Sequence, residues 1–322
     1  MLDPAVAAVR LAVRPLVTED ATAMVACSGG ADSLALLAAT VFEGHKVGAR
    51  VVGVTVDHGL QDGSSEHAAS VVGQMATLGV DETASIRVTV DAGAIGVEAG
   101  ARRARYAALT QLAEHFSARI VLLGHTLDDQ AETVLLGLAR GSGARSLSGM
   151  RRSFDGLFVR PLLDLTRDQT EAACRAEDIA FWADPHNSDP RFTRSRVRHH
   201  VLPVLERELG PGVAPTLART ADQLRADADA LDDLASTALE AARHHDGLDV
   251  RTLTDLAPAI RTRVLRLAAV HAGAIPADLF HAHVVELDRL VTDWHGQKWV
   301  DLPGHLRAVR RGDLLTFDPQ SG

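Results

Sequence analysis

The stretch "VACSGGADSLALLAA", residues 25–39, joins two apolar runs through a turn made of glycines, serines and one acid. The first run is typical of a buried β-strand and the second of a helix. Glycines after a strand let the backbone approach an anion closely, and the N-terminus of the next helix supplies N–H groups and the positive end of its dipole. The stretch therefore predicts an anion-binding turn between a strand and a helix.

Short β-branched runs alternate with helical patterns along the first half of the chain. The predicted strands are residues 22–28, 49–56, 84–90 and 118–124, and the predicted helices are residues 32–43, 65–79, 97–117 and 128–139. This alternation predicts an α/β fold, a doubly wound and mostly parallel sheet with helices on both faces. Ligands of such sheets bind at the carboxyl ends of the strands, where Ser28–Gly29–Gly30, Asp57–His58–Gly59 and Gly124–His125 stand here. We expect one shared site at that edge.

The second half of the chain has a different character. "ELGPGVAP", residues 208–215, ends a helix and marks a domain boundary, and a long helix with a seam of leucines and alanines follows it. "LRAVRRGDLLTF", residues 306–317, predicts a hairpin that turns at Gly312–Asp313. We expect a first domain at residues 1–208 and a smaller, mainly helical domain at residues 213–322.

Composition bounds the class of protein. The chain has 322 residues, of which 46% are apolar, and no apolar run is long enough to span a bilayer. The N-terminal stretch predicts a short amphipathic helix and not a secretion signal, so we expect a cytoplasmic location and no membrane partner. Cys27 and Cys174 are the only cysteines, which excludes a disulfide scaffold and a cysteine-based zinc or iron–sulfur site. The net charge of −9 argues only weakly against nucleic acid, because local basic groups decide such binding.

The turn at residues 28–33 lacks a lysine. Lys46 and Lys298 are the only lysines, against 31 arginines, so the chain has no candidate for the lysine of a P-loop kinase or GTPase. Asp32 would repel a phosphate by itself, but it fits a turn in which Mg²⁺ bridges carboxylate and phosphate oxygens. The alternative is that Asp32 and Ser33 only cap the helix.

Three acids follow the fourth predicted strand. Asp128, Asp129 and Glu132 fall in the first turns of a predicted helix, directly after His125. They have two interpretations. Acids at a helix N-terminus are favoured by its dipole, and Thr126 with Asp129 forms a capping box. Alternatively, the acids bind a cationic substrate or Mg²⁺, or deprotonate an amine, and their position beside His125 favours this.

Arginines gather in two further segments. In "ARRARYAAL", residues 101–109, Arg105 lies on the core-facing stripe of its helix and needs an anionic partner, and Arg102 lies close by. In residues 189–198, Asp189–Pro190 predicts a helix start, after which Arg191, Arg194 and Arg198 share one face. This face suits a phosphate backbone, although such a charge run is also typical of a solvated face.

Together these motifs resemble a known family. "SGGADS" is similar to the SGGxDS loop of the N-type ATP pyrophosphatases (PP-loop superfamily), which cleave ATP between the α and β phosphates. With "VDHGL" (56–60), "ARRARYAAL", "LGHTLDDQAETVLLGLARGSG" (123–143), "RPLLDLTRDQTEAAC" (160–174) and "DPHNSDPRFTRSRVR" (184–198), it resembles the tRNA(Ile)-lysidine synthetase family in its short form. The resemblance implies two steps. ATP adenylates the C2 oxygen of the wobble cytidine in tRNA(Ile) with a CAU anticodon, and L-lysine then displaces AMP to give lysidine.

The resemblance also implies roles for individual residues. ATP would be bound by Ser28, Gly29, Gly30, Asp32, Ser33, Asp57, His58 and Arg102, with Mg²⁺ on Asp32. The catalytic set would be Asp32, Arg105, His125, Asp128, Asp129 and Glu132. Contacts to tRNA would come from Arg140, Arg191, Arg194, Arg198 and the C-terminal domain. Asp128, Asp129 and Glu132 would receive the lysine ammonium and help to deprotonate it.

Two other functions remain open at this point. An enzyme of the 2-thiocytidine type has the same loop, but its chemistry requires paired cysteines that this chain lacks. A non-catalytic ATP-binding module would use the turn without turnover, and its acids would be helix caps. The oligomeric state is also open, a homodimer included.

Overall fold

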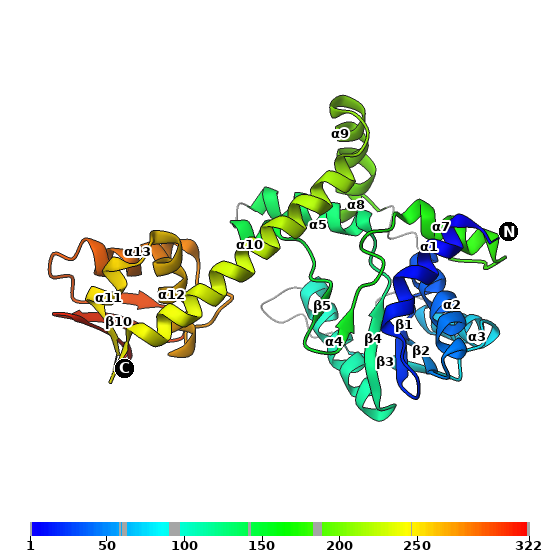
Figure 1. The fold of residues 1–322 in the computed structure, drawn as a ribbon, viewed down its shortest axis with the longest axis horizontal. Helices are drawn as coiled ribbons and strands as arrows, with labels where there is room; N and C mark the ends of the chain where they lie inside the picture. Colours follow the sequence, from blue (N-terminus) through cyan, green and yellow to red (C-terminus); the bar gives the residue numbers. More distant parts are fainter. Residues whose placement is uncertain are drawn as a thin grey trace. The chain divides into compact units, whose positions relative to one another are not determined.

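The computed structural model describes residues 2–57, 59, 63–89, 97–140, 143–182, 189–245 and 247–320 (Figure 1). The chain divides into two compact units. The first comprises Met1–Gly141 and Ser146–Ala221, and the second comprises Ser142–Arg145 and Asp222–Gly322. Each unit has its own hydrophobic core.

A six-stranded sheet forms the centre of the first unit, in the order β3-β2-β1-β4-β6-β5. Its strands are β1 (Thr22–Ala26), β2 (Arg50–Asp57), β3 (Glu82–Arg87), β4 (Ala118–Leu123), β5 (Ser153–Phe154) and β6 (Phe158–Val159). Neighbouring strands are parallel, except that β5 pairs antiparallel with β6 at the edge. The predicted parallel sheet is confirmed, and the short pair β5–β6 is an addition to it.

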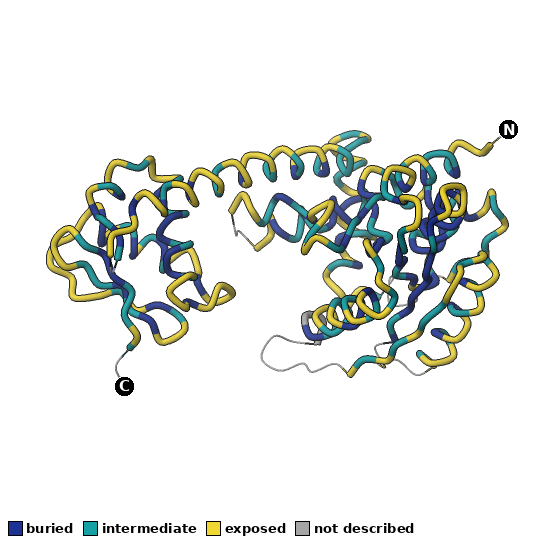
Figure 2. Tube along the Cα trace, turned by 60° about the horizontal axis from the view of Figure 1, so that its bottom comes forward, coloured by how far each residue is buried: buried dark blue, intermediate teal, exposed yellow. Residues whose placement is uncertain are grey.

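Helices cover both faces of this sheet. They are α1 (Pro4–Val13), α2 (Ala31–Lys46), α3 (Ser64–Thr77), α4 (Val97–His115) and α7 (Arg167–Ala176). Helix α5 (Leu127–Arg140) packs instead against Val197 and Leu202. Successive side chains of β1 point to opposite faces: Val25 packs in the core beneath α1, α2 and α7, and Met24 packs in the core beneath α4. The central strands β1 and β2 are buried along most of their length (Figure 2), as a sheet covered on both faces requires, whereas the edge strand β3 is half-buried or exposed. In the described part of the chain, no helix is long and apolar enough to cross a membrane.

The segment after α7 differs from the prediction at one point. The helix expected to start at Asp189–Pro190 begins instead at Thr193, because the Asp189 carboxylate accepts the Arg191 N–H at 2.9 Å and closes a turn there. Helix α8 (Thr193–Arg196) continues as a π-helix over Val197–Val201 and then as α9 (Leu202–Leu209). A π-helical turn inside a helix is rare and is found mostly at functional sites.

The second unit combines helices with a five-stranded antiparallel sheet in the order β7-β8-β11-β10-β9. Its elements after α10 (Val213–Ala242) are β7 (Arg243–His244), β8 (Gly247–Asp249), α11 (Val250–Asp255), α12 (Pro258–His271), α13 (His281–Thr292), β9 (Val300–Leu302), β10 (Leu306–Arg311) and β11 (Leu314–Pro319). The predicted hairpin is confirmed, since Arg311 pairs with Leu314 around the turn. The other strands are two or three residues long, too short to show a period of two in the sequence.

Candidate active site

The turn between β1 and α2 has the geometry predicted for an anion site. Gly29 has φ +80°, and a Cβ atom there would lie 2.7 Å from Val71 Cγ2, so only glycine fits. The Ser33 hydroxyl donates to Gly30 O at 2.9 Å and accepts from the Ser28 N–H at 3.1 Å, which braces the turn from within. No described side chain caps α2 at Gly30, so the N-terminus of α2 presents its N–H groups to the turn.

Neighbouring segments hold this turn in place. The Trp182 N–H donates to Gly29 O at 2.9 Å, and His67 Nε2 lies 3.0 Å from Ser28 O. At the end of β4, a Cβ atom on Gly124 would lie 3.0 Å from backbone atoms of Asp32. The end of β4 therefore lies directly against the start of α2, and the side chains that follow the two strands share one edge of the sheet.

Asp32 is the acid of the turn. One of its oxygens, Oδ1, accepts a hydrogen bond from the Thr170 hydroxyl of α7, and its other oxygen lies 3.7 Å from Arg167 Nε. Burial raises the pKa of Asp32 to about 6, although Thr170 and Arg167 oppose this. A largely buried carboxylate beside an anion-binding turn is a ligand type that Mg²⁺ accepts when phosphates and water supply the other oxygens. Among the described residues, no group of three or more His, Cys, Asp or Glu side chains is placed to hold a metal ion.

The three acids of α5 differ in burial and in their partners. Asp128 is half-buried and accepts the Arg167 N–H at 2.8 Å. Asp129 is buried, and its Oδ2 accepts the Thr126 N–H at 2.9 Å, so the capping interpretation is correct for this oxygen. Glu132 is 0% exposed. The other oxygen of Asp129 and both oxygens of Glu132 face arginines.

Three arginines surround these buried carboxylates. Arg194 Nε and Arg198 Nε donate to the two oxygens of Glu132, each at 2.6 Å. Arg194, Arg198 and Arg167 all reach Asp129 Oδ1, at 3.2–3.3 Å. Burial would raise the pKa of Asp129, but Arg194 and Arg167 outweigh it and hold that pKa below its ordinary value. Arg194 and Arg198, which we predicted to contact tRNA, thus bind carboxylates of this chain, and neither belongs to a merely solvated face.

We call Asp32, Asp129, Glu132, Arg167, Arg194 and Arg198 the acid–arginine network. Its ion pairs join α2, α5, α7 and α8 with its π-helical continuation. Three carboxylates face three guanidinium groups, so the network balances its charge although its acids are mostly buried. Removing one partner from such a set leaves an uncompensated charge, which is costly.

A second group of cations lies beside His125. Arg160 is buried, and it donates to His125 Nδ1 at 3.3 Å and to the Tyr106 hydroxyl at 3.2 Å. Burial, with Arg105, Arg160 and Arg194 nearby, lowers the pKa of His125 to about 3, so this imidazole is neutral at physiological pH. Burial also lowers the pKa of Arg105. In the described part of the chain, no carboxylate pairs with Arg105, so the anionic partner that the sequence requires for it is not a side chain seen here.

The remaining predicted site residues lie apart from the acid–arginine network. Asp57 ends β2, accepts the Gly59 N–H at 2.8 Å and has a lowered pKa, mainly through this bond. Arg102 is exposed, with its guanidinium 5.0 Å from the Tyr106 ring centre. Arg140 is exposed at the end of α5, and Arg191 is exposed and pairs with Asp189. His58 lies outside the described residues.

Sequence reasoning missed Arg167 and Thr170 as site residues. Both lie in a segment that carried the family resemblance, but no motif within it pointed to chemistry. The usable signal was the capping box of Thr166 and Gln169, which sets the first turn of α7 and so places Arg167 at its first position. The contact to Asp32 spans 138 positions in the sequence, so only the fold reveals it.

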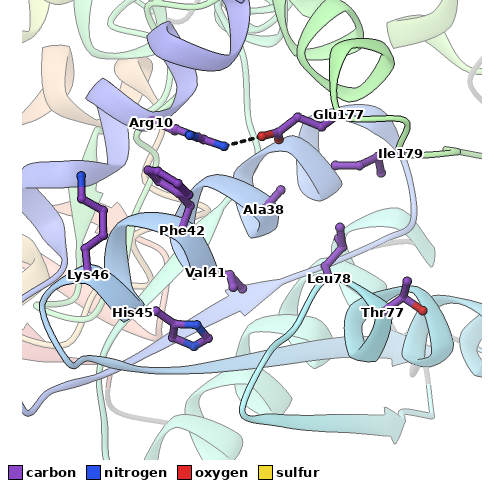
Figure 3. Close-up of a pocket in the computed structure, with 10 residues that line it drawn as sticks. All are labelled: Arg10, Ala38, Val41, Phe42, His45, Lys46, Thr77, Leu78, Glu177 and Ile179. Atoms are coloured by element: carbon purple, nitrogen blue, oxygen red, sulfur yellow. Dashed lines mark hydrogen bonds and ion pairs between the residues drawn. The ribbon is translucent and has the colours of Figure 1, made fainter. Parts of the chain in front are cut away.

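A groove of about 620 Å³ lies elsewhere in the first unit, between α1, α2, α3 and α7 (Figure 3). The Arg10 guanidinium lies 3.4 Å from the Phe42 ring centre and pairs with Glu177 beside it. None of the residues that line this groove belongs to the predicted site. We therefore do not assign this groove to the active site.

Known proteins resemble this chain in sequence and in fold. Residues 6–205 match the family described as "PP-loop domain", and residues 248–315 match the "TilS substrate binding domain". A protein of Salinispora arenicola named tRNA(Ile)-lysidine synthase is 52% identical over 326 residues, which cover 99% of this chain and 98% of that protein. The chain belongs to the tRNA(Ile)-lysidine synthase family. A family member from Thermobifida fusca is 53% identical over 311 residues, covering 95% of each chain.

A solved structure resembles this chain in fold. The U34-tRNA thiolase NcsA from Methanococcus maripaludis, with its [4Fe-4S] cluster, aligns with a TM-score of 0.58 over 68% of this chain and 78% of that one. The two sequences are 16% identical, so the likeness concerns the fold alone. Together with the match to the PP-loop domain, it confirms the mostly parallel α/β sheet that the sequence predicts.

Proposed function

We propose that this chain attaches L-lysine to C2 of the wobble cytidine of tRNA(Ile) with a CAU anticodon, consuming ATP and releasing AMP and pyrophosphate. The observation that carries the proposal is the close approach of two unlike groups at one sheet edge. An anion-binding turn with Asp32 lies against the buried acids of α5, and Arg167 contacts both. A ligase that first activates with ATP and then binds an amine needs these two groups side by side. The near full-length similarity to tRNA(Ile)-lysidine synthases supports the same reaction.

In the first step, the C2 oxygen of the cytidine attacks the α-phosphate, and pyrophosphate leaves. The turn at residues 28–33 and the N-terminus of α2 would hold the departing phosphates. Asp32 would hold Mg²⁺, which neutralises phosphate charge when bound. Arg105, which lacks a carboxylate partner among the described residues, would stabilise negative charge that develops on the transferred phosphate. Arg102 is exposed and would contribute from further out.

In the second step, the amine of lysine attacks C2, and the bond from C2 to the adenylate oxygen breaks, releasing AMP. The amine must first lose a proton, because an ammonium is not nucleophilic. Asp128 suits the first contact with the ammonium, since it is half-buried and its described partner is a single backbone N–H. Asp129 and Glu132 would add negative potential behind it. Neutral His125, held by Arg160, would orient the adenylate without adding charge.

The second unit offers a surface for the tRNA contact that we propose for residues 213–322. Residues 292–299 are exposed throughout and include Trp294, Trp299 and Lys298. Arg310 and Arg307 lie against the two indole rings, 4.7 and 4.6 Å from the ring centres. Exposed aromatic rings beside cations are typical of surfaces that stack nucleic-acid bases and contact phosphates. Arg140 and Arg191 of the first unit, both exposed, would add phosphate contacts.

The competing 2-thiocytidine activity finds little support in the cysteines. Cys27 and Cys174 are both buried, and burial raises the pKa of both thiols, that of Cys174 to about 12. Burial therefore disfavours the thiolate form of both cysteines. We place the proposed reaction in the cytoplasm, where tRNA, ATP and lysine meet, and a homodimer stays a prediction.

The deciding experiment is mass analysis of the tRNA after incubation with the protein, ATP, Mg²⁺ and isotopically labelled lysine. We expect one labelled lysine on the wobble cytidine, and pyrophosphate and AMP in equal amounts. Omission of tRNA should stop pyrophosphate release. A protein that binds ATP but releases no pyrophosphate with tRNA and lysine present would be a non-catalytic module, and sulfur at the cytidine would point to the thiolation enzymes.

A further inference from the structure

We propose that Arg167 is a positioning residue that holds the phosphate-side acid Asp32 and the lysine-side acid Asp129 at a set spacing, so that both half-reactions use one geometry. The inference rests on the proposed function and assigns a role to a residue that the family resemblance left without one. Arg167 would touch neither the reacting phosphate nor the amine. It would act through the carboxylates that it contacts.

The contacts of Arg167 differ from those of the other two arginines in the acid–arginine network. Its Nη2 donates to Asp129 Oδ1 at 3.2 Å, its Nε lies 3.7 Å from Asp32 Oδ2, and its Nη1 lies 3.9 Å from Glu132 Oε1. Its side chain is 22% exposed, so these contacts lie largely out of water. Within the described part of the chain, Arg194 and Arg198 form ion pairs with the acids of α5 only, although the charge of Arg198 also acts on Asp32 from further away. Of the three arginines, Arg167 alone forms ion pairs with both the acid of α2 and those of α5.

The backbone around Arg167 is anchored on both sides. Its N–H donates to Asp128 at 2.8 Å, and the Leu127 N–H donates to Leu165 O at 2.9 Å, so the starts of α5 and α7 are tied together. From the same turn of α7, the Thr170 hydroxyl donates to Asp32. A side chain that extends from such a fixed backbone is preorganised, and a small misplacement of reacting groups lowers the rate strongly.

Charge explains why an arginine stands between the two acids. Asp129 raises the pKa of Asp32 and Arg167 lowers it, so the guanidinium offsets the repulsion between two largely buried carboxylates. A guanidinium presents several donors in a plane and can serve two acceptors at once. A lysine ammonium at the same place carries the charge but reaches fewer of these oxygens, so Arg167→Lys should restore only part of the function.

The test compares three variants of the full chain with the wild type. Arg167→Gln removes the link to both acids. Thr170→Val removes a hydroxyl that bonds Asp32 and the Arg167 carbonyl oxygen, so of the two acids it affects Asp32 directly. Arg175→Gln is the control on the same helix, where it breaks an exposed pair with Glu171. Three quantities are measured: binding of ATP with Mg²⁺ by calorimetry, binding of labelled lysine by equilibrium dialysis, and the rates of pyrophosphate and lysidine formation.

We expect Arg167→Gln to weaken lysine binding and to slow pyrophosphate release, each on the order of tenfold or more. Thr170→Val should slow pyrophosphate release and leave lysine binding unchanged. Arg175→Gln should match the wild type, and Arg167→Lys should lie between the wild type and Arg167→Gln.

Three results would overturn the inference. The first is an Arg167→Gln protein that changes only one of the two half-reactions. The second is a Thr170→Val protein in which pyrophosphate release and lysine binding fall by the same factor. The third is an Arg167→Lys protein that matches the wild type in both quantities. If Arg167→Gln does not fold, Arg167→Lys and Thr170→Val decide the matter by the same measurements. A wild-type protein that forms no lysidine would refute the proposed function instead, which keeps the two failures distinct.

Discussion

Arg198 Nε donates to Glu132 Oε1 at 2.6 Å, and the Glu132 side chain is 0% exposed. The two residues are 66 positions apart, one on α5 and the other in the π-helical turn after α8. Because Arg194 binds the other Glu132 oxygen at 2.6 Å, the carboxylate is fully engaged. A lysine ammonium that approaches this acid therefore meets an ion-pair network and not a free carboxylate.

Replacing Glu132 should destabilise the first unit. Glu132→Gln leaves Arg194 and Arg198 without their shared buried carboxylate, so we expect a loss of about 3–5 kcal/mol in the free energy of unfolding. Urea unfolding measures this. Glu171→Gln, which breaks an exposed pair with Arg175, should cost less than about 1 kcal/mol. Equal losses in the free energy of unfolding for the two variants would contradict the prediction that the Glu132 ion pairs stabilise the first unit.

Asp32 should be needed for the first step only. Asp32→Asn keeps an oxygen for the Thr170 hydroxyl but removes the charge that would hold Mg²⁺, so pyrophosphate release should fall by at least about a hundredfold while tRNA still binds. Asp20→Asn is a suitable control, since Asp20 is exposed before the amino end of β1. If the Asp32→Asn protein still releases pyrophosphate at the wild-type rate, Asp32 takes no part in the first step.

His125 should make stability depend on pH. The pKa of His125 in the folded chain is about 3, below the ordinary value of 6.5. Between these two pH values the imidazole is protonated in the unfolded chain and neutral in the folded chain. Stability is therefore full above about pH 6.5 and falls as the pH is lowered, by up to about 1.4 kcal/mol per pH unit from this group. His125→Asn keeps an acceptor for Arg160 but does not titrate. Urea midpoints between about pH 7 and 5 should fall less steeply for this variant than for the wild type. Identical slopes would show that folding does not lower the pKa of His125.

Arg191 and Arg194 should separate in their effects on tRNA binding. Arg191 is exposed, so Arg191→Gln should lower the slope of log K against log salt by about 1 and leave stability within about 0.5 kcal/mol of the wild type. Arg194→Gln should lower stability instead, because Arg194 binds buried acids. Filter binding over a salt series and urea unfolding measure the two effects. Arg119→Gln, an exposed change at the amino end of β4, is the control. An unchanged salt slope in Arg191→Gln would show that Arg191 makes no phosphate contact and is only a solvated surface residue.

Trp299 should contribute to tRNA affinity if residues 292–299 form an RNA-binding surface. Trp299→Ala removes an exposed ring that Arg307 lies against, and we expect tRNA binding to weaken by about 1–3 kcal/mol. Fluorescence titration with labelled tRNA(Ile) measures this. Leu234→Ala, an exposed apolar truncation on α10, should have no effect. If both variants bind tRNA like the wild type, the surface serves another purpose.

The sequence predicted much of the fold because each local signal agreed with the next. The strand–helix alternation, the glycine turn at residues 28–33 and the hairpin at Gly312–Asp313 all appear where expected. The short strands β5–β9 were missed, since strands of two or three residues carry no periodicity. The helix start at Asp189 was misplaced, because the carboxylate closes a turn there and the cap lies further on.

By itself the sequence determined which residue types are present and in what local setting: an anion-binding turn with an acid, three acids at a helix start, and arginines on two helices. It could not decide which of these charges face each other. The tertiary structure brings Arg194 and Arg198 to Glu132 and places Arg167 between Asp32 and Asp129. The reason is physical: a charge removed from water must find its partner wherever the packed helices put it, and such pairing has no signature along the chain.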